Sequence, residues 1–167
     1  MTLQTTSPHE RALPASCTIV PAEPADLESL CHLDPDAMAD YRQRDFVASA
    51  IEDGRCWVAF FDETLVAYGV FNYQFHGYGV IHRVFVWPAF RRRGIGRALL
   101  DYFSDACSSP RLYITVPQSE LAMQELLRTR GFVLSGGIRE FGDEGTALIY
   151  VKDLLTATPA LKGRGVQ

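Results

Sequence analysis

The stretch from Arg91 to Gly96, which reads RRRGIG, has the residue types of an anion-binding loop. Glycine lets a backbone turn tightly and approach a ligand, because it has no side chain. Apolar residues follow at helical spacing, so a helix is expected to begin here. The first turn of a helix leaves N–H groups unpaired and carries the positive end of the helix dipole, an arrangement that suits phosphate. No acidic residue lies from His82 to Leu100, which favours a local anion site.

Other phosphate-binding and nucleic-acid-binding loops fit this stretch less well. A Walker A loop requires Gly-Lys-Ser/Thr, and the only lysines are Lys152 and Lys162. A dinucleotide fingerprint requires a third glycine where Leu99 stands. The formal net charge of −4 argues against a nucleic-acid partner, because the chain offers one basic cluster and overall acidity. A basic helix cap without a ligand stays open as the structural alternative.

The elements that position this loop follow from hydrophobic periodicity and turn residues. Strands are expected at 17–20, 56–61, 65–71, 77–87, 111–116, 132–138 and 146–151, and helices at 24–33, 36–54, 95–106 and 119–130. This order predicts an α/β domain of three layers around a mixed sheet. The loop then joins the end of a sheet strand to the start of a helix.

Length and composition indicate one globular domain over residues 17–155, with a flexible arm over 1–16 and a flexible tail over 156–167. The four cysteines show neither CxxC spacing nor a Cys/His cluster, so reduced thiols and no metal are expected. No stretch suits a membrane span, and the N-terminus lacks the apolar core of a signal peptide. A cytoplasmic location and no membrane partner are therefore expected.

Residues 91–96 resemble the R/Q-x-x-G-x-G/A signature of the GNAT superfamily of N-acetyltransferases. The wider stretch 84–103 resembles the strand, proline, loop and helix unit of that family, and 123–141 resembles its later helix, Gly-Phe and strand. The order of elements fits over roughly residues 17–152. The resemblance implies a mixed, mostly antiparallel sheet that is splayed between its fourth and fifth strands.

The resemblance also implies acetyl-CoA as the cosubstrate, with its pyrophosphate on the loop and the helix start. The residues implied there are Arg91, Arg92, Arg93, Gly94, Ile95, Gly96 and Arg97. The pantetheine arm would pair like an added strand with Val84, Phe85 and Val86, because an unpaired strand edge offers N–H and C=O groups to an amide-bearing chain. Arg93 and Arg97 are alternatively solvated surface residues.

For catalysis, the resemblance implies that an amine attacks the thioester directly, with the amide of Val86 as the oxyanion donor. The place of a glutamate base in some members falls at Val80. Strand alternation predicts His82 on the same face, and imidazole titrates near neutral pH. His82 is therefore the predicted base, acting directly or through water. The alternative is a hydrogen-bonded histidine on the sheet.

The general acid departs from the family pattern. Many members carry an asparagine and a tyrosine where this chain has Glu120 and Leu127. Leucine cannot donate a proton, so the CoA thiolate would leave and be protonated by water. The same departure leaves a second hypothesis open, a catalytically silent acyl-CoA-binding or regulatory domain.

The acceptor is predicted only as a class, a small-molecule or peptide amine. Asp143 and Glu144 in the last hairpin are candidates to hold an ammonium group, although an ordinary polar turn has the same composition. Aromatic residues at 68, 73, 75 and 78 would line an apolar acceptor pocket, fill the core or form a dimer face. The sequence therefore predicts an acetyl-CoA-dependent N-acetyltransferase of EC class 2.3.1, and leaves a homodimer open.

Overall fold

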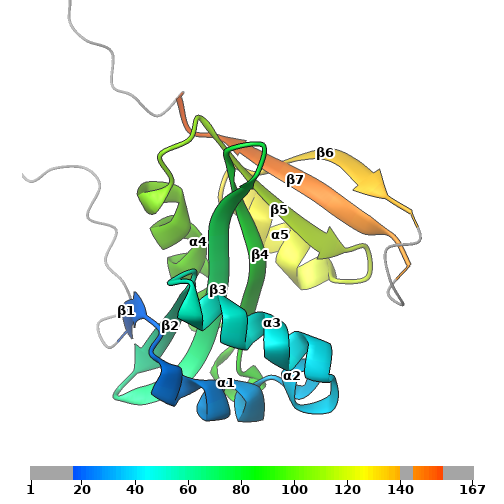
Figure 1. The fold of residues 1–167 in the computed structure, drawn as a ribbon. Coiled ribbons are helices and arrows are strands. Elements are labelled where there is room, and N and C mark those ends of the chain that lie inside the picture. Colours follow the sequence, from blue (N-terminus) through cyan, green and yellow to red (C-terminus); the bar gives the residue numbers. More distant parts are fainter. Residues whose placement is uncertain (1–16, 140–144, 156–167) are drawn as a thin grey trace, which may run out of the picture. The chain divides into compact units, whose positions relative to one another are not determined.

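The structure is a computed structural model that describes residues 17–139 and 145–155. Seven strands form a mixed sheet in the order β1-β2-β3-β4-β5-β7-β6. Their bounds are β1 (Cys17–Pro21), β2 (Cys56–Phe61), β3 (Thr64–Phe75), β4 (Tyr78–Val86), β5 (Arg111–Pro117), β6 (Val133–Ile138) and β7 (Ala147–Asp153) (Figure 1). β4 and β5 are parallel, and the other neighbours are antiparallel. The α/β fold class predicted from the sequence is confirmed.

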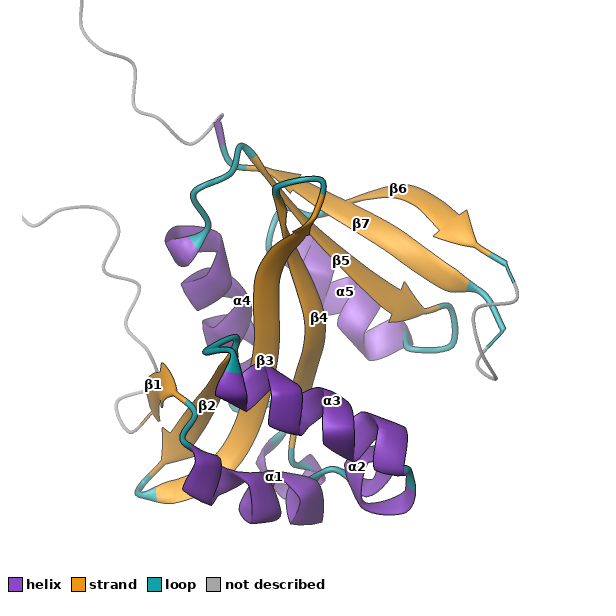
Figure 2. Ribbon diagram, in the orientation of Figure 1, coloured by secondary structure: helices purple, strands orange, loops and turns teal. Residues whose placement is uncertain are grey.

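The described helices are drawn in purple in Figure 2. They are α1 (Leu27–Leu33), α2 (Pro35–Ala39), α3 (Tyr41–Glu52), α4 (Ile95–Ala106) and α5 (Leu121–Thr129), with short 3₁₀ turns at Pro24–Asp26 and Pro88–Phe90. The single helix predicted over 36–54 is wrong, because the chain breaks at Asp40. Asp40 has extended backbone angles, and its carboxylate accepts from the N–H of Arg42 as the N-cap of α3. An Asp that caps a new helix competes with continuation of the old one.

Contacts divide the chain into two compact units, and β3, β4 and α4 contribute residues to both. The first unit contains residues 17–70 and 83–101. Its core lies between α1, α3 and the strands β2 and β3, and its fully buried members are Leu30, Val47, Ala50, Val58, Tyr68 and Val70. Each of the helices α1, α2 and α3 contacts the other two. The apolar face of α3 thus packs on β2 and β3.

The second unit contains residues 71–82 together with the described residues from 102 onward. β7 pairs with β5 on one side, from Ala147↔Pro117 to Asp153↔Arg111, and with β6 on the other. Phe71 stacks on Phe103 with ring centroids 5.5 Å apart. Gly79 is required here, because a Cβ at this position would lie 2.4 Å from the sulfur of Cys107.

The parallel ladder between β4 and β5 is short. It joins Gly79–Ile81 to Leu112–Ile114 and no further described pair. β4 itself continues to Val86, so its last five residues extend past the end of this ladder. The pairing of β4 thus changes within the strand, where the sequence places the predicted site.

None of the helices within residues 17–139 and 145–155 is long and apolar enough to cross a membrane.

The four thiols differ in environment, which gives a chemical test of the fold. Cys17, Cys31 and Cys56 are buried, whereas Cys107 is partly exposed. Burial raises the pKa of Cys17 and Cys31, and raises that of Cys56 to about 12. Because the thiolate is the reactive form, we expect one thiol per chain to react quickly with Ellman's reagent at pH 8. Cys107→Ser is expected to remove that fast phase.

Labelling of a second thiol at a similar rate would contradict the packing around the buried cysteines.

The raised pKa of Cys56 also has a consequence for stability. The neutral thiol is favoured in the folded chain, so this contribution is complete below the reference pKa of 9.0. It is lost as the pH rises from about 9 toward 12. Denaturation at pH 8 and pH 10.5 would show a smaller loss of stability for Cys56→Ala than for the wild type.

Candidate functional site

The loop between β4 and α4 makes the sharp turn expected of its glycine. β4 ends at Val86, and α4 begins at Ile95. Gly94 has a φ of 81°, in the left-handed region that glycine adopts readily. Its carbonyl accepts from the N–H of Ala98 at 2.9 Å, which is the first bond of the helix. The N–H groups of residues 95–97 therefore have no acceptor within the helix and point toward its open end.

Arg92 is a second left-handed residue in this loop, with a φ of 65°. A side chain in this conformation crowds its own backbone, which costs about 1–2 kcal/mol per residue. Backbone strain of this kind is concentrated at functional sites, where the surrounding structure maintains it. Arg92 is exposed and stands between two arginines whose side chains are held by neighbours.

Arg91 and Arg93 pack back onto the first unit. The Nε of Arg91 donates to the carbonyl of Val86 at 2.9 Å, and its guanidinium lies 5.9 Å from the centroid of the Phe85 ring. The guanidinium of Arg93 lies 5.0 Å from the Phe90 ring centroid. These contacts hold two cationic groups beside the loop. Within residues 17–139 and 145–155 neither group forms an ion pair, so no described carboxylate offsets their charge.

Arg97 differs from the other three arginines, because it forms an ion pair with Asp101 one turn later in α4, at 3.8 Å. An exposed pair of this kind contributes little to stability. It partly offsets the charge of Arg97, which agrees better with the surface alternative for this residue than with a strong anion contact.

The backbone of β4 presents different groups to its two edges. The N–H of Trp87 donates to the carbonyl of Val66 in β3 at 2.8 Å. Since the polar groups of a strand alternate in direction, those of Phe85 also face β3, whereas those of Val84 and Val86 face the opposite edge. Arg91 occupies the carbonyl of Val86 on that edge. An amide-bearing chain could therefore use the amide of Val86 and both polar groups of Val84, but not the backbone of Phe85.

His82, the predicted base, is exposed and bonded to the neighbouring strand. Its Nε2 lies 3.0 Å from Oδ1 of Asn72, a residue that is only 6% exposed. That amide oxygen also accepts from the N–H of Gln74, and the amide nitrogen donates to the side-chain oxygen of Gln74. Because Oδ1 is an acceptor, Nε2 of His82 is the donor and carries the proton. A neutral His82 therefore accepts through Nδ1.

A buried charged cluster includes Arg83, which directly precedes the predicted site residue Val84 in the sequence. The sequence alone did not indicate this cluster. The carboxylate of Asp34 is fully buried and accepts from Nε of Arg83 at 2.9 Å and from Nη2 at 2.5 Å. The hydroxyl of Tyr68 donates to the same carboxylate oxygen at 2.5 Å. Arg83 also pairs with Asp36 at 2.9 Å. Asp34 is the N-cap of α2 as well, accepting from the N–H of Asp36.

The neighbours of Arg83 keep its guanidinium charged. Burial by itself would lower the pKa of Arg83, but the interactions with Tyr68, Asp34 and Asp36 raise it well above its ordinary value. Burial raises the pKa of Tyr68, which stays a neutral hydroxyl donor. The Asp34-Pro35 pair signals a helix start in the sequence. Its partner Arg83, 49 residues away, gives no local signal.

This cluster also decides the role of one predicted aromatic residue. Tyr68 is fully buried and bonded to Asp34, so of the alternatives left open for it the core one is correct.

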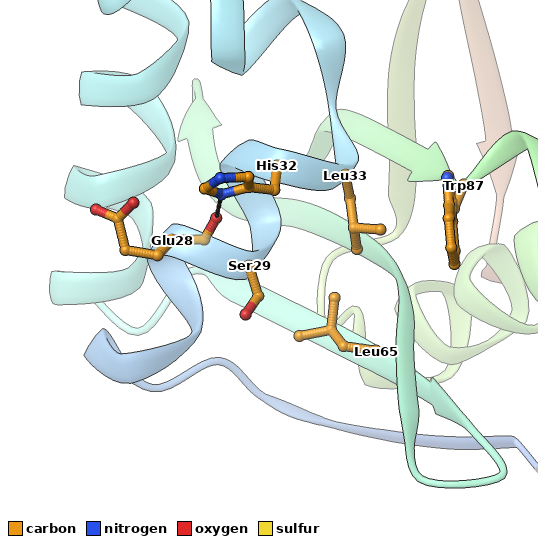
Figure 3. Close-up of a pocket in the computed structure, with 6 residues that line it drawn as sticks. All are labelled: Glu28, Ser29, His32, Leu33, Leu65 and Trp87. Carbon is orange, nitrogen blue, oxygen red and sulfur yellow. Dashed lines mark hydrogen bonds between the residues drawn. The ribbon is translucent and has the colours of Figure 1, made fainter.

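A hollow of about 660 Å³ lies elsewhere in the first unit (Figure 3). Its lining residues are Glu28, Ser29, His32, Leu33, Leu65 and Trp87. The Nδ1–H of His32 donates to the carbonyl of Glu28, and the Glu28 carboxylate pairs with Arg44. Much of its polar lining is thus bonded within the helices, and the hollow includes none of the residues predicted for cofactor or catalysis.

The comparisons with known proteins decide the family. Residues 22–132 match the acetyltransferase (GNAT) family. This chain belongs to the GNAT acetyltransferase family. That family uses acetyl-CoA. A comparison with curated protein sequences gives no match.

Solved GNAT acetyltransferases and related enzymes share the fold at low identity. An acetyltransferase of the GNAT family from Bacillus cereus is 23% identical with a TM-score of 0.74, covering 82% of this chain and 96% of that one. The ribosomal-protein-S18-alanine N-acetyltransferase of Escherichia coli is 21% identical with a TM-score of 0.69, covering 90% and 99%. Arabidopsis thaliana Naa50, in complex with the bisubstrate analogue CoA-Ac-MVNAL, is 17% identical with a TM-score of 0.69, covering 83% and 99%.

Leu127 stands at the position that the family resemblance assigns to a tyrosine, so this chain has no side-chain proton donor there. Leu127 is fully buried in the second unit. Glu120 is exposed and precedes α5, without a side-chain hydrogen bond to the helix start. Leu127 is therefore a core residue.

The predicted acceptor residues Asp143 and Glu144 lie outside the described residues of this chain. Within the part that is described, no group of three or more His, Cys, Asp or Glu is placed to hold a metal ion.

The turn at Gly94 is testable without any ligand. Gly94→Ala places a side chain at a φ of 81°, so we expect the free energy of unfolding to fall by about 1–2 kcal/mol in urea denaturation. Gly54→Ala is the matched control, since Gly54 has a φ of 66° and open space around it, and a similar loss is expected. Gly96→Ala, inside α4, should show no such loss. A Gly94→Ala variant as stable as the wild type would contradict the turn.

Proposed function

We propose that this chain transfers the acetyl group of acetyl-CoA to a primary amine by direct attack in a ternary complex. The observation that carries the proposal is the left-handed turn at Gly94, which leads directly into the start of α4 beside Arg91–Arg93. The family match supports the same donor.

The residues present fit the charge and shape of CoA. The N–H groups at the start of α4 and the positive end of its dipole suit the pyrophosphate. Arg91, Arg92 and Arg93 add positive charge in a chain of net charge −4, which makes the attraction local. The edge of β4 that carries the polar groups of Val84 and Val86 would pair with the pantetheine amides, as in strand addition.

The chemistry then requires an oxyanion donor, a base and a leaving group. When bound, acetyl-CoA supplies an activated acetyl thioester. The N–H of Val86 faces the edge of β4 opposite β3 and is the proposed donor to the oxyanion of the tetrahedral intermediate. His82 is the proposed base, and its Nδ1 would take the amine proton, directly or through water, because Nε2 donates to Asn72. The thiolate would leave without a side-chain acid and take a proton from water.

The acceptor class is proposed from the relatives. The Escherichia coli enzyme is named for an alanine of ribosomal protein S18, and Naa50 was solved with a peptide-containing bisubstrate analogue. We propose a peptide N-terminus or a small amine as the acceptor, with Asp143 and Glu144 as the residues that would hold its ammonium group.

A catalytically silent acyl-CoA-binding domain is the second candidate, favoured by buried Leu127 at the expected position of the acid. The two candidates share the donor site and differ in turnover. Release of CoA in the presence of a panel of peptide and small-molecule amines supports the transferase. Tight binding of acetyl-CoA without CoA release across the panel supports the silent domain.

Binding at the loop is the first expectation to measure. Isothermal titration of the wild type with acetyl-CoA and with desulfo-CoA is expected to show binding of both. Gly94→Trp should abolish it, because an indole would fill the space of the pyrophosphate. Gly54→Trp places the same side chain at another left-handed glycine with open surroundings, and should bind normally. No binding to the wild type at millimolar ligand would overturn the proposal.

The role of His82 is tested by kinetics once an acceptor is found. A positioned base contributes about 10²–10⁴-fold to the rate, so His82→Ala is expected to lower kcat by at least about 100-fold with little change in acetyl-CoA affinity. The matched control is His32→Ala, an exposed histidine in the first unit. The variant should also lose the rise of kcat with pH near neutrality. An unchanged pH profile would assign His82 to the sheet alone.

A further inference from the structure

The Asp34–Arg83–Tyr68 cluster is unusual because it buries a carboxylate completely. An ion pair held away from water gains little net stability, since both groups lose their hydration. Asp34 nevertheless has no exposed surface, and three hydrogen bonds from Arg83 and Tyr68 converge on one of its oxygens. Such an arrangement fixes geometry more than it adds stability, because the planar guanidinium bonds in a defined direction.

The geometry that it fixes is that of β4 at residue 83. Arg83 directly precedes Val84, the first residue proposed to pair with pantetheine. Three further contacts hold the residues that follow. The Phe85 ring lies 6.0 Å from the Tyr68 ring, and the Arg83 guanidinium lies 5.7 Å from the centroid of the Phe85 ring. The N–H of Trp87 is tied to Val66.

These anchors act on alternate residues of β4. Residues 83, 85 and 87 are held by the start of α2 and by residues of β3 that belong to the first unit. Val84 and Val86 lie between them, and their polar groups face the opposite edge. The contacts at residues 83, 85 and 87 thus fix the position and direction of the N–H and C=O groups of Val84 and Val86. The side chains that make these contacts need not touch the ligand.

We propose that Arg83 is a positioning residue for the cosubstrate: clamped by Asp34 and Tyr68, it preorganises the free edge of β4 for the pantetheine arm of CoA. The inference rests on the proposed function. The inference predicts different effects on the binding of two parts of CoA. The nucleotide half of CoA meets the loop at Gly94 and the start of α4, whereas the pantetheine arm meets Val84 and Val86. A change at Arg83 should weaken binding of the second part alone.

The experiment compares two ligands by isothermal titration. One is CoA, and the other is the nucleotide half of CoA, with its ribose phosphate and pyrophosphate but no pantetheine. Arg83→Lys keeps the positive charge and so compensates Asp34, but it loses the bidentate fork. We expect its dissociation constant for CoA to rise about tenfold, the change that corresponds to loss of about 1.4 kcal/mol of binding. The constant for the nucleotide half should stay within about twofold.

Matched variants keep the test valid if Arg83→Lys fails to fold. Tyr68→Phe removes one hydroxyl from the cluster and leaves the ion pair intact. Arg83→Met combined with Asp34→Asn removes both charges, so that no unpaired charge remains buried. Both are expected to shift the CoA constant in the same selective way. Arg44→Lys changes an exposed pair with Glu28 and should leave both ligands unaffected.

The outcomes are distinguishable. Selective loss of CoA affinity, with the nucleotide half still bound, supports the positioning role. Equal loss of both ligands, or no loss of either, in folded variants overturns it and leaves the cluster as a support of the fold. Absence of CoA binding to the wild type itself overturns the proposed function and this inference together.

Discussion

Every buried or ligand-facing backbone group needs a hydrogen-bond partner, and β4 meets this requirement differently along its length. At Gly79–Ile81 the strand pairs with β5, and β3 is its neighbour on the other side. From residue 83 onward, β3 and the side chains around Asp34 hold one side of the strand, while Val84 and Val86 direct their groups the other way. Arg91 satisfies one of these, the carbonyl of Val86. In the proposed function, the remaining groups are the backbone part of the site, which most substitutions leave unchanged.

The loop that follows adds charge to this backbone surface. Arg91 and Arg93 pack on aromatic rings, so their guanidinium groups lie beside the helix start and their side chains have restricted motion. A guanidinium on a ring keeps its charge and loses rotamer freedom before any ligand arrives, which lowers the entropy that binding must overcome. The glycine turn and the packed arginines are thus two parts of one preorganised surface.

Much of this arrangement was predictable, because it depends on local sequence. The glycine turn, the start of α4 and its apolar face at Ile95, Leu99 and Phe103 follow from residues close together in the chain, and the last three are fully buried as their spacing predicts. The break at Asp40 was missed because the apolar period continues through it. The Asp34–Arg83 pair and the bond of His82 to Asn72 join different elements, so no local pattern could show them. Alternation along β4 gave a face for His82 but not the tautomer that Asn72 imposes.

Arg92 has a consequence for how this loop can change. Its φ of 65° is one that glycine would adopt at less cost, so the arginine side chain is present in spite of the backbone. At this position, folding stability and local positive charge favour different residues. A selection for heat resistance alone would tend to replace Arg92 by glycine, and the more stable loop would have lost one of its cations. In the proposed function, in which this charge attracts CoA, stability and cosubstrate affinity are therefore in direct competition at this residue.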